Sequence, residues 1–143
     1  MFYRFKVLNF YIAVICSFGP NLMAADLRVK VAGFDNNKGQ LLTKLFVEGD
    51  NVLGHGHWQG MALIHNAQAF VNFKSLHAGT YALVVVHDTN INSEIDHSAL
   101  RMPVEQLGFS NHFKLGFFSG LPTFQKLKFE VNEPQTELTV IVR

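Results

Sequence analysis

The fold is decided by a run of six apolar residues, Tyr81-Ala82-Leu83-Val84-Val85-Val86. Successive side chains of a strand point to opposite faces of its sheet, so a strand that has no polar face must be covered on both sides. We therefore expect Thr80–His87 to be a central strand, with the core against one face and a covered surface on the other.

Shorter segments on both sides of this run predict further strands. In the first of them, Leu27, Val29 and Val31 alternate with Arg28 and Lys30, which is the period of a strand with one buried face. The predicted strands are Asp26–Phe34, Gln40–Val47, Ala67–Lys74, Phe124–Val131 and Thr136–Val142. The turn-forming residues at 36–39 predict that the first two strands form a hairpin.

Two longer stretches lack this alternation and are expected to be loops. Residues 48–66 carry four glycines, with a short helix expected around Gly60–Ala67, and residues 88–123 are rich in turn-forming residues that allow a helical turn around Glu94–Ala99. No helical stripe of 3.6-residue period follows residue 25. The pattern predicts an all-β fold, an antiparallel β-sandwich of immunoglobulin-like or transthyretin-like type with long loops.

Composition restricts the class of protein. A chain of 143 residues with 48% hydrophobic and 16% charged residues is typical of one globular domain. Its 12 basic and 11 acidic residues give a net charge of +1, which provides no positive field for nucleic acid. The single Cys16 excludes an intramolecular disulfide bond.

The first segment has the order of an export signal. Arg4 and Lys6 precede the apolar stretch Val7–Phe18, and small residues follow at Ala24 and Ala25. Twelve helical residues span about 18 Å, which is well short of a bilayer core of about 30 Å. We expect residues 1–25 to be a signal peptide cleaved near Ala24 or Ala25. Residues 26–143 would then form a single domain, periplasmic or extracellular, without a transmembrane segment or Cys and with a net charge of −1.

Oxygen-bearing side chains follow the central strand at alternate positions, Asp88, Asn90, Asn92, Glu94 and Asp96. Ca²⁺ binds six to eight oxygen atoms, and side chains at every second position of a tight loop can converge on one ion. Asp88, Asn90, Asn92 and Asp96 are thus candidate ligands for Ca²⁺, the one cofactor that the sequence suggests. The alternative is a polar loop in which Asp88 and Asn90 bond to their own backbone as Asx turns.

Several motifs together resemble one bacterial family. They are His87-Asp88-Thr89-Asn90-Ile91-Asn92, Gly108-Phe109-Ser110-Asn111 and Leu121-Pro122-Thr123-Phe124. In this order they resemble the exported proteins grouped as domain of unknown function 2141, and the resemblance spans Asp26–Arg143. It implies an exported domain, expected to be a β-sandwich, with no established activity. Where that family usually has Gly, this chain has Ile91 and Ser93.

Patterns of known enzymes are missing from the sequence. It contains no Gly-x-Ser-x-Gly elbow, phosphate loop, dinucleotide fingerprint or His-Glu-x-x-His motif. We therefore expect a protein that is not an enzyme, with a hydrolase around Ser110 and His112 as a further alternative. His55 and His57 are close in sequence, but two imidazoles do not make a metal site, and we expect them to be exposed and without a metal.

The 88–118 region is the predicted location of function, because binding residues concentrate on loops that a rigid scaffold presents. We expect a non-enzymatic binding or structural module whose partner is a protein or small ligand. The candidate surface residues are His87, Phe109, Asn111, Phe117 and Phe118. For Phe109, Phe117 and Phe118 the alternative is a role in covering the core.

Overall fold

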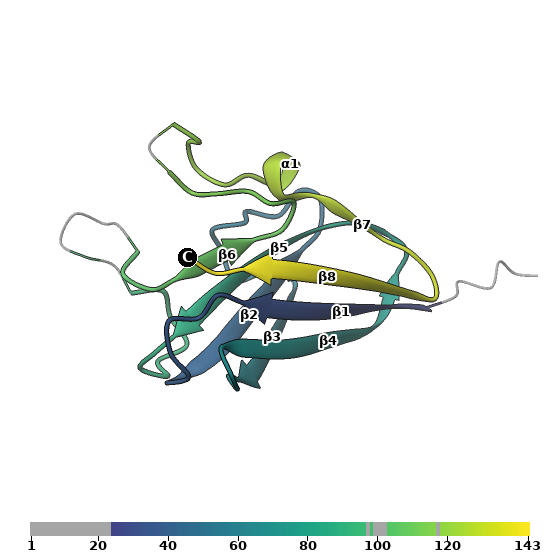
Figure 1. Cartoon of the computed structure of the whole chain (residues 1–143). Coiled ribbons are helices and arrows are strands. Elements are labelled where there is room, and N and C mark those ends of the chain that lie inside the picture. The colour runs from purple at the N-terminus through teal and green to yellow at the C-terminus, as the bar shows by residue number, and fades with distance from the viewer. Residues whose placement is uncertain (1–23, 97, 99–102, 117) are drawn as a thin grey trace, which may run out of the picture.

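A computed structural model describes residues 24–96, 98, 103–116 and 118–143 and shows two β-sheets packed face to face (Figure 1). One sheet has the strand order β4-β1-β8 and the other has the order β3-β2-β5-β6, with β7 paired to β5. The strands are β1 (Ala24–Ala32), β2 (Gln40–Phe46), β3 (Trp58–Leu63), β4 (Gln68–His77), β5 (Gly79–Asp88), β6 (Leu107–Phe109), β7 (Phe129–Val131) and β8 (Gln135–Ile141). The predicted β-sandwich is confirmed.

The main core lies between the two sheets. Leu27, Val29 and Val31 of β1 are fully buried there, as their alternation with charged residues predicts. Ala25, near which the signal peptide is predicted to be cleaved, is also fully buried in β1. Most of the predicted signal peptide, residues 1–23, lies outside the described residues.

Strand β5 is buried on both faces, as the run of apolar residues predicts. Tyr81, Leu83 and Val85 face the core between the sheets. Ala82 and Val84 face a second apolar cluster on the other side of the sheet, together with Phe46, Val52, Phe109, Phe124 and Leu127. One edge of β5 pairs with β2, while β7 and β6 share the opposite edge. The strand is therefore fixed on four sides, and its C-terminal end provides a rigid base for the loop that follows.

The predicted hairpin between the first two strands is wrong. Strand β1 pairs with β4 and, in parallel, with β8, whereas β2 pairs with β3 and β5 in the other sheet. Both strands have apolar side chains to bury, and they do so by facing each other across the core instead of lying side by side. The connection between them passes close to the end of β5, where a Cβ atom on Gly39 would lie 2.0 Å from the Asp88 carbonyl oxygen.

Strand β3 occupies a segment that was predicted to be a loop with a short helix. Its residues alternate between half-buried and exposed, but the exposed positions include Met61 and Leu63, and one inward position is Gly60. Because apolar side chains lie on the exposed face and a glycine lies on the inward face, the sequence does not show the alternation of apolar and polar residues that is typical of a strand. Gly60 is required because a Cβ atom there would lie 2.6 Å from Val71 and 2.7 Å from Thr43.

The predicted strand Phe124–Val131 is only partly correct. Residues Phe124–Leu127 form one helical turn, α1, and the strand β7 is limited to Phe129–Val131. Phe124 and Leu127 are three residues apart and are both buried on one side of the turn, which leaves Lys126 on the outside. The helical turn expected around Glu94–Ala99 is absent from residues 94–96, and the rest of that segment is only partly described.

The connections β5–β6 and β6–α1 project beyond the sheets on the left of Figure 1, away from the N-terminal end of β1. We call their described residues, 89–96, 98, 103–106, 110–116 and 118–123, the loop end of the molecule. Within the described part of the chain, no helix is long and apolar enough to cross a membrane.

Candidate functional site

Asp88 closes β5 and anchors the first loop. Its carboxylate is fully buried and accepts hydrogen bonds from Gln40 Nε2 at 2.9 Å and from the backbone N–H groups of Ser93 at 3.0 Å and Asn92 at 3.2 Å. Burial acts to raise the pKa of Asp88, but these donors outweigh it and hold the pKa below its ordinary value. Both oxygens point toward the loop backbone and sheet, so Asp88 has an anchoring role.

Asn90, Asn92 and Asp96 converge on the outer side of the same loop. The Asp96 carboxylate accepts hydrogen bonds from Asn90 Nδ2 at 2.7 Å and from Asn92 Nδ2 at 3.0 Å. Each amide oxygen also accepts a backbone N–H, from Asn92 at 3.3 Å and from Glu94 at 2.9 Å. The Asx turns and the convergence of side chains therefore occur together in one loop. Asp88 Oδ1 borders this group, because it shares the Asn92 N–H with Asn90 Oδ1.

The loop backbone is left-handed at two positions that carry side chains. Ile91 has a φ of 59° and Ser93 a φ of 63°. Such values are unusual for residues other than Gly, and most of all for a β-branched residue such as Ile. The chain thus keeps a tightly turned loop although it lacks the residue best suited to it.

Glu105 is a site residue that the sequence analysis missed. It is only 8% exposed and packs against the loop, where its Oε2 accepts the backbone N–H of Asp96 at 3.4 Å. Its Oε1 is buried and has no hydrogen-bond partner among the described residues. Burial and, to a lesser extent, the carboxylates of Asp88 and Asp96 raise the pKa of Glu105 above its ordinary value. The one signal in the sequence was a lone acidic residue just before a short buried strand.

His87 is not at the surface, which corrects its prediction as a binding residue. Its ring is buried beside Phe34, with Nδ1 3.1 Å from Gln106 Oε1 and Nε2 2.8 Å from the Lys38 carbonyl oxygen. Because both ring nitrogens have partners, His87 serves to hold the β1–β2 connection against the end of β5. Its position two residues after Val85, on the same face of the strand, was the signal for burial.

The Gly-Phe-Ser-Asn motif is structural. Phe109 is buried in the second apolar cluster, which corrects its prediction as a surface residue. The buried Ser110 hydroxyl accepts the Leu83 N–H at 2.9 Å and donates to the Leu127 carbonyl. Asn111 is exposed, and its side-chain amide donates to the Lys126 carbonyl at 3.1 Å. Thus Ser110 joins β5 to α1.

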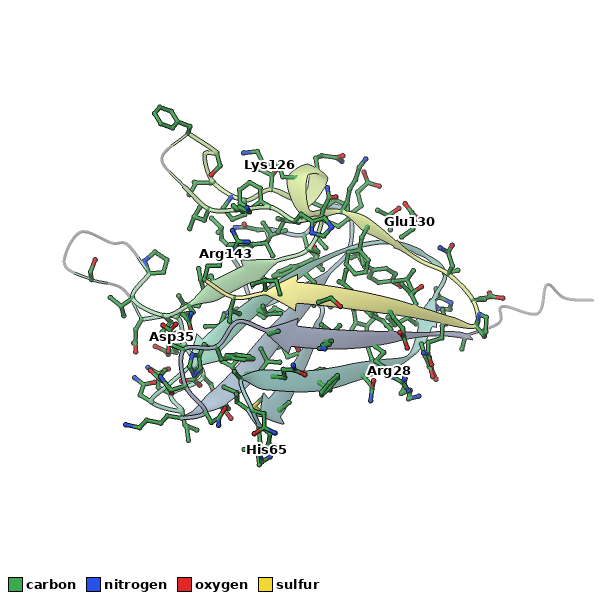
Figure 2. All side chains as sticks on the ribbon, viewed as in Figure 1. Arg28, Asp35, His65, Lys126, Glu130 and Arg143 are labelled. Atoms are coloured by element: carbon green, nitrogen blue, oxygen red, sulfur yellow. The ribbon has the colours of Figure 1, made fainter. Side chains whose placement is uncertain are left out.

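Phe118 lies on a small, internally bonded turn of the loop end. It is fully exposed, with a relative accessibility of 104%, and Leu121 beside it is 67% exposed. Lys126, a residue of α1 that Figure 2 labels, donates through its Nζ to the carbonyl oxygens of Ser119 at 2.7 Å and Leu121 at 2.9 Å. Phe117, also predicted as a surface residue, lies outside the described residues.

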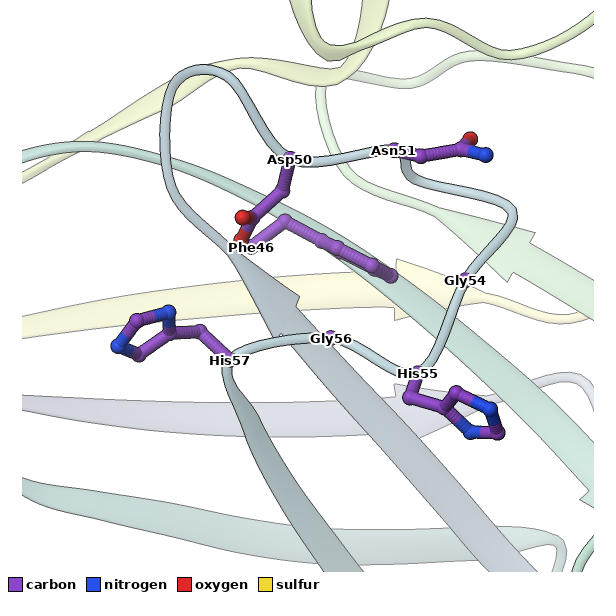
Figure 3. A pocket seen from close by; sticks show the side chains of 7 residues that line it. All are labelled: Phe46, Asp50, Asn51, Gly54, His55, Gly56 and His57. Atoms are coloured by element: carbon purple, nitrogen blue, oxygen red, sulfur yellow. The ribbon is translucent and has the colours of Figure 1, made fainter.

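A shallow pocket of about 240 Å³ is formed by the end of β2 and the connection from β2 to β3. It is lined by Phe46, Asp50, Asn51, Gly54, His55, Gly56 and His57. Figure 3 shows the rings of His55 and His57 pointing away from each other. Among the residues that the structure describes, no group of three or more His, Cys, Asp or Glu side chains is placed to hold a metal ion.

Comparison with known proteins gives one match. A family model described as "Uncharacterized protein conserved in bacteria (DUF2141)" matches residues 29–139. Neither the curated proteins nor the solved structures contain a significant match to the chain. The matched residues include nearly all of the sandwich, the Asp88–Asp96 loop, Glu105 and the Phe118 turn.

Proposed function

The chain belongs to the DUF2141 family of uncharacterized proteins conserved in bacteria, and we propose that it is an exported, non-enzymatic binding module. Its binding surface is the loop end, and its partner is a protein with an apolar site for an aromatic side chain. The single observation that carries this proposal is the complete exposure of Phe118.

Exposure of Phe118 has a cost that folding does not explain. Burial of a Phe side chain is worth about 1.5–3 kcal/mol. Leu121 and the partly exposed Leu115 add apolar area to the same projecting loop. Exposed apolar side chains grouped on one loop favour a protein interaction site, whereas single ones scattered over a surface are common and need no explanation.

The turn that carries Phe118 is supported from below. Within the turn, Gly116 N–H donates to Ser119 Oγ at 2.8 Å. Lys126 binds two carbonyls of the turn and lies 5.6 Å from the centre of the Phe113 ring, which packs edge-on against the buried Phe109. A continuous set of contacts thus joins the second apolar cluster to the turn, and it supports the presentation of Phe118 in a fixed place.

Two observations favour a protein partner over a small ligand or a substrate. The pocket beside Phe46 is smaller than the roughly 300–1,000 Å³ of typical ligand sites. Ser110 of the alternative hydrolase site is buried, and its hydroxyl is bonded to backbone groups instead of to His112. A projecting apolar turn is better suited to a site on another protein.

The test is photo-crosslinking in the producing cells with a photoreactive phenylalanine analogue at position 118. We expect one discrete covalent adduct, whose second protein mass spectrometry identifies. The matched control is the same analogue at Phe70, which is 55% exposed on the outer face of the β4-β1-β8 sheet. Absence of an adduct from position 118, or the same adducts from both positions, would show that the loop end is not the binding surface.

A further inference from the structure

We propose that Asn90, Asn92, Asp96 and Glu105 form a binding site for Ca²⁺ at the loop end. Three of these residues were predicted from the sequence, and Glu105 is added by the fold, while Asp88 becomes the anchor of the loop and is not a ligand. This site is independent of the Phe118 surface, because it uses a different loop and different chemistry.

The four side chains supply the oxygen atoms that a hard cation prefers. Asp96 and Glu105 contribute two negative charges, which match one divalent ion, and the two amides contribute neutral oxygens. Each amide oxygen accepts one backbone N–H and keeps a second lone pair for a cation. Water and backbone carbonyls would complete the six to eight ligands of Ca²⁺.

The buried Glu105 Oε1 is the observation that points to a missing ligand. A buried polar atom without a partner is costly, and the cost is greater for a charged group, so native structures rarely leave one unexplained. Among the described residues Glu105 Oε1 is such an atom, and the other oxygen of the same carboxylate bonds to the backbone N–H of Asp96. The Thr89 N–H lies near enough to lower the pKa of Glu105 but makes no hydrogen bond of normal geometry with it. A cation held between Glu105 and the Asp96 side chain would supply the missing partner.

The charge balance of the loop supports the same conclusion. The carboxylates of Asp88 and Asp96 lie close enough to Glu105 to raise its pKa by electrostatic repulsion. Among the described residues, the ion pairs are Arg28–Glu137 and Lys74–Asp26, and neither involves this group. Three neighbouring carboxylates that have no ion-pair partner within the described part of the chain repel one another, and a divalent ion removes most of that repulsion.

Binding would require only a local change. The Asp96 oxygens now accept the Nδ2 groups of Asn90 and Asn92, so binding would break these two hydrogen bonds and turn both amide oxygens toward the cation. The anchoring bonds of Asp88 to Gln40 and Ser93 would stay in place. Because only two carboxylates take part and the loop is largely exposed, we expect a Kd of about 10⁻⁴–10⁻³ M, as in other extracellular calcium modules.

The experiment is a thermal unfolding series with isothermal titration calorimetry on the purified protein in CaCl₂, MgCl₂ or chelator. We expect 10 mM Ca²⁺ to raise the Tm by about 5–10 °C over chelator. Mg²⁺ should have a smaller effect, because it demands near-ideal octahedral geometry. An equal effect of Mg²⁺ would overturn the assignment to Ca²⁺.

Substitutions then locate the site. Glu105→Gln and Asp96→Asn keep the size of the side chain and remove one charge, and each is expected to weaken Ca²⁺ binding at least tenfold. Glu94→Gln is the matched control, since Glu94 is an exposed acid of the same loop, and its Ca²⁺ response should stay within twofold of the unmodified protein. No response of the unmodified protein to Ca²⁺, or an undiminished response in Asp96→Asn, would refute the proposal without affecting the Phe118 surface.

Discussion

Asp88 illustrates how a single buried carboxylate can fix a loop. Because its pKa is depressed in the folded protein, the folded state holds the charged form more tightly than the unfolded chain does. The stabilisation is therefore present above the ordinary pKa of 3.8 and is lost as the pH falls through the folded pKa. The direction of the pKa shift distinguishes Asp88 from Glu105, whose pKa is raised in the folded protein.

We predict that Asp88→Asn lowers the free energy of unfolding at pH 7 by about 2–3 kcal/mol, because three donors lose a charged acceptor. The difference from the unmodified protein should shrink below pH 3.8. Urea unfolding at pH 7 and below pH 3.8, in the presence of chelator, measures this difference in the free energy of unfolding. The control is Asp35→Asn, because Asp35 is exposed. A difference that stays constant with pH would contradict the anchoring role of the charged carboxylate.

The left-handed loop residues allow a second prediction at this scale. Ile91→Gly should stabilise the protein by about 0.5–1 kcal/mol, since relief of the left-handed strain outweighs the greater entropy of Gly in the unfolded chain. Ile95 is the matched control in the same loop; its φ is negative, so Ile95→Gly should be destabilising. Chemical denaturation tests both variants, and a loss of stability in Ile91→Gly would show that the Ile side chain has a packing role.

At the scale of elements, the connection between β1 and β2 depends on its contact with the end of β5. Gly39→Ala is expected to destabilise the fold by more than 3 kcal/mol, because its Cβ atom would overlap the backbone of Asp88 and Thr89. Gly49→Ala shares the positive φ but has open space around it, and it should cost only about 1–2 kcal/mol. Equal losses in the two denaturation midpoints would mean that the close approach is unimportant.

The support of the Phe118 turn gives a prediction for α1. Lys126→Met removes both bonds to the turn and keeps the length of the side chain, so amide protons of 118–121 should exchange faster with solvent while those of β5 stay protected. Lys128→Met, an exposed lysine at the end of the same helical turn, is the control. Unchanged exchange in Lys126→Met would indicate that the turn is ordered by its own hydrogen bonds.

The strands were predicted correctly where the buried positions are apolar and the exposed positions are polar. The runs of β1, β5 and β8 were recognised because their inward positions are apolar and their polar positions face outward, or because no polar face exists. Strand β3 was missed because Met61 and Leu63 face solvent while Gly60 faces the core. The sheet to which β1 belongs is a long-range property, and a local turn at 36–39 gave no information about it.

The site was predicted in part for a similar reason. The convergence of Asn90, Asn92 and Asp96 follows from local spacing, which a sequence displays directly. Glu105 reaches the same loop only because Val104 N–H bonds to the Asp96 carbonyl and brings the chain back beside it. The position of His87 two residues after Val85 on the same face of β5 already indicated its burial, but its contact with Phe34 is a property of the fold. The packing of Phe109 against Phe113 is likewise a contact that the sequence alone could not place.

At the scale of the whole molecule, we infer that the loop end is the functional end and that a partner covers it. The sandwich is buried and satisfied around β5, whereas the loop end carries both the exposed Phe118 and the unpaired Glu105 oxygen. Loops on a rigid scaffold are where binding residues concentrate. We expect the outer face of the β4-β1-β8 sheet to remain uncovered, so a position on that face is the control for a position at the loop end.

The most direct test is cysteine accessibility in the producing cells. The chain has one Cys, Cys16, which lies in the predicted signal peptide, so a single introduced thiol can be followed in the processed protein. The test variant is Lys114→Cys, which places a thiol next to the Phe118 turn and leaves Phe118 itself unchanged. The control variant is Asn72→Cys, which places a thiol on the outer face of β4. We predict that maleimide labels position 114 at least fivefold more slowly in cells than in the purified protein, while position 72 reacts equally in both. Equal labelling of position 114 in cells and in purified protein would contradict a covered loop end.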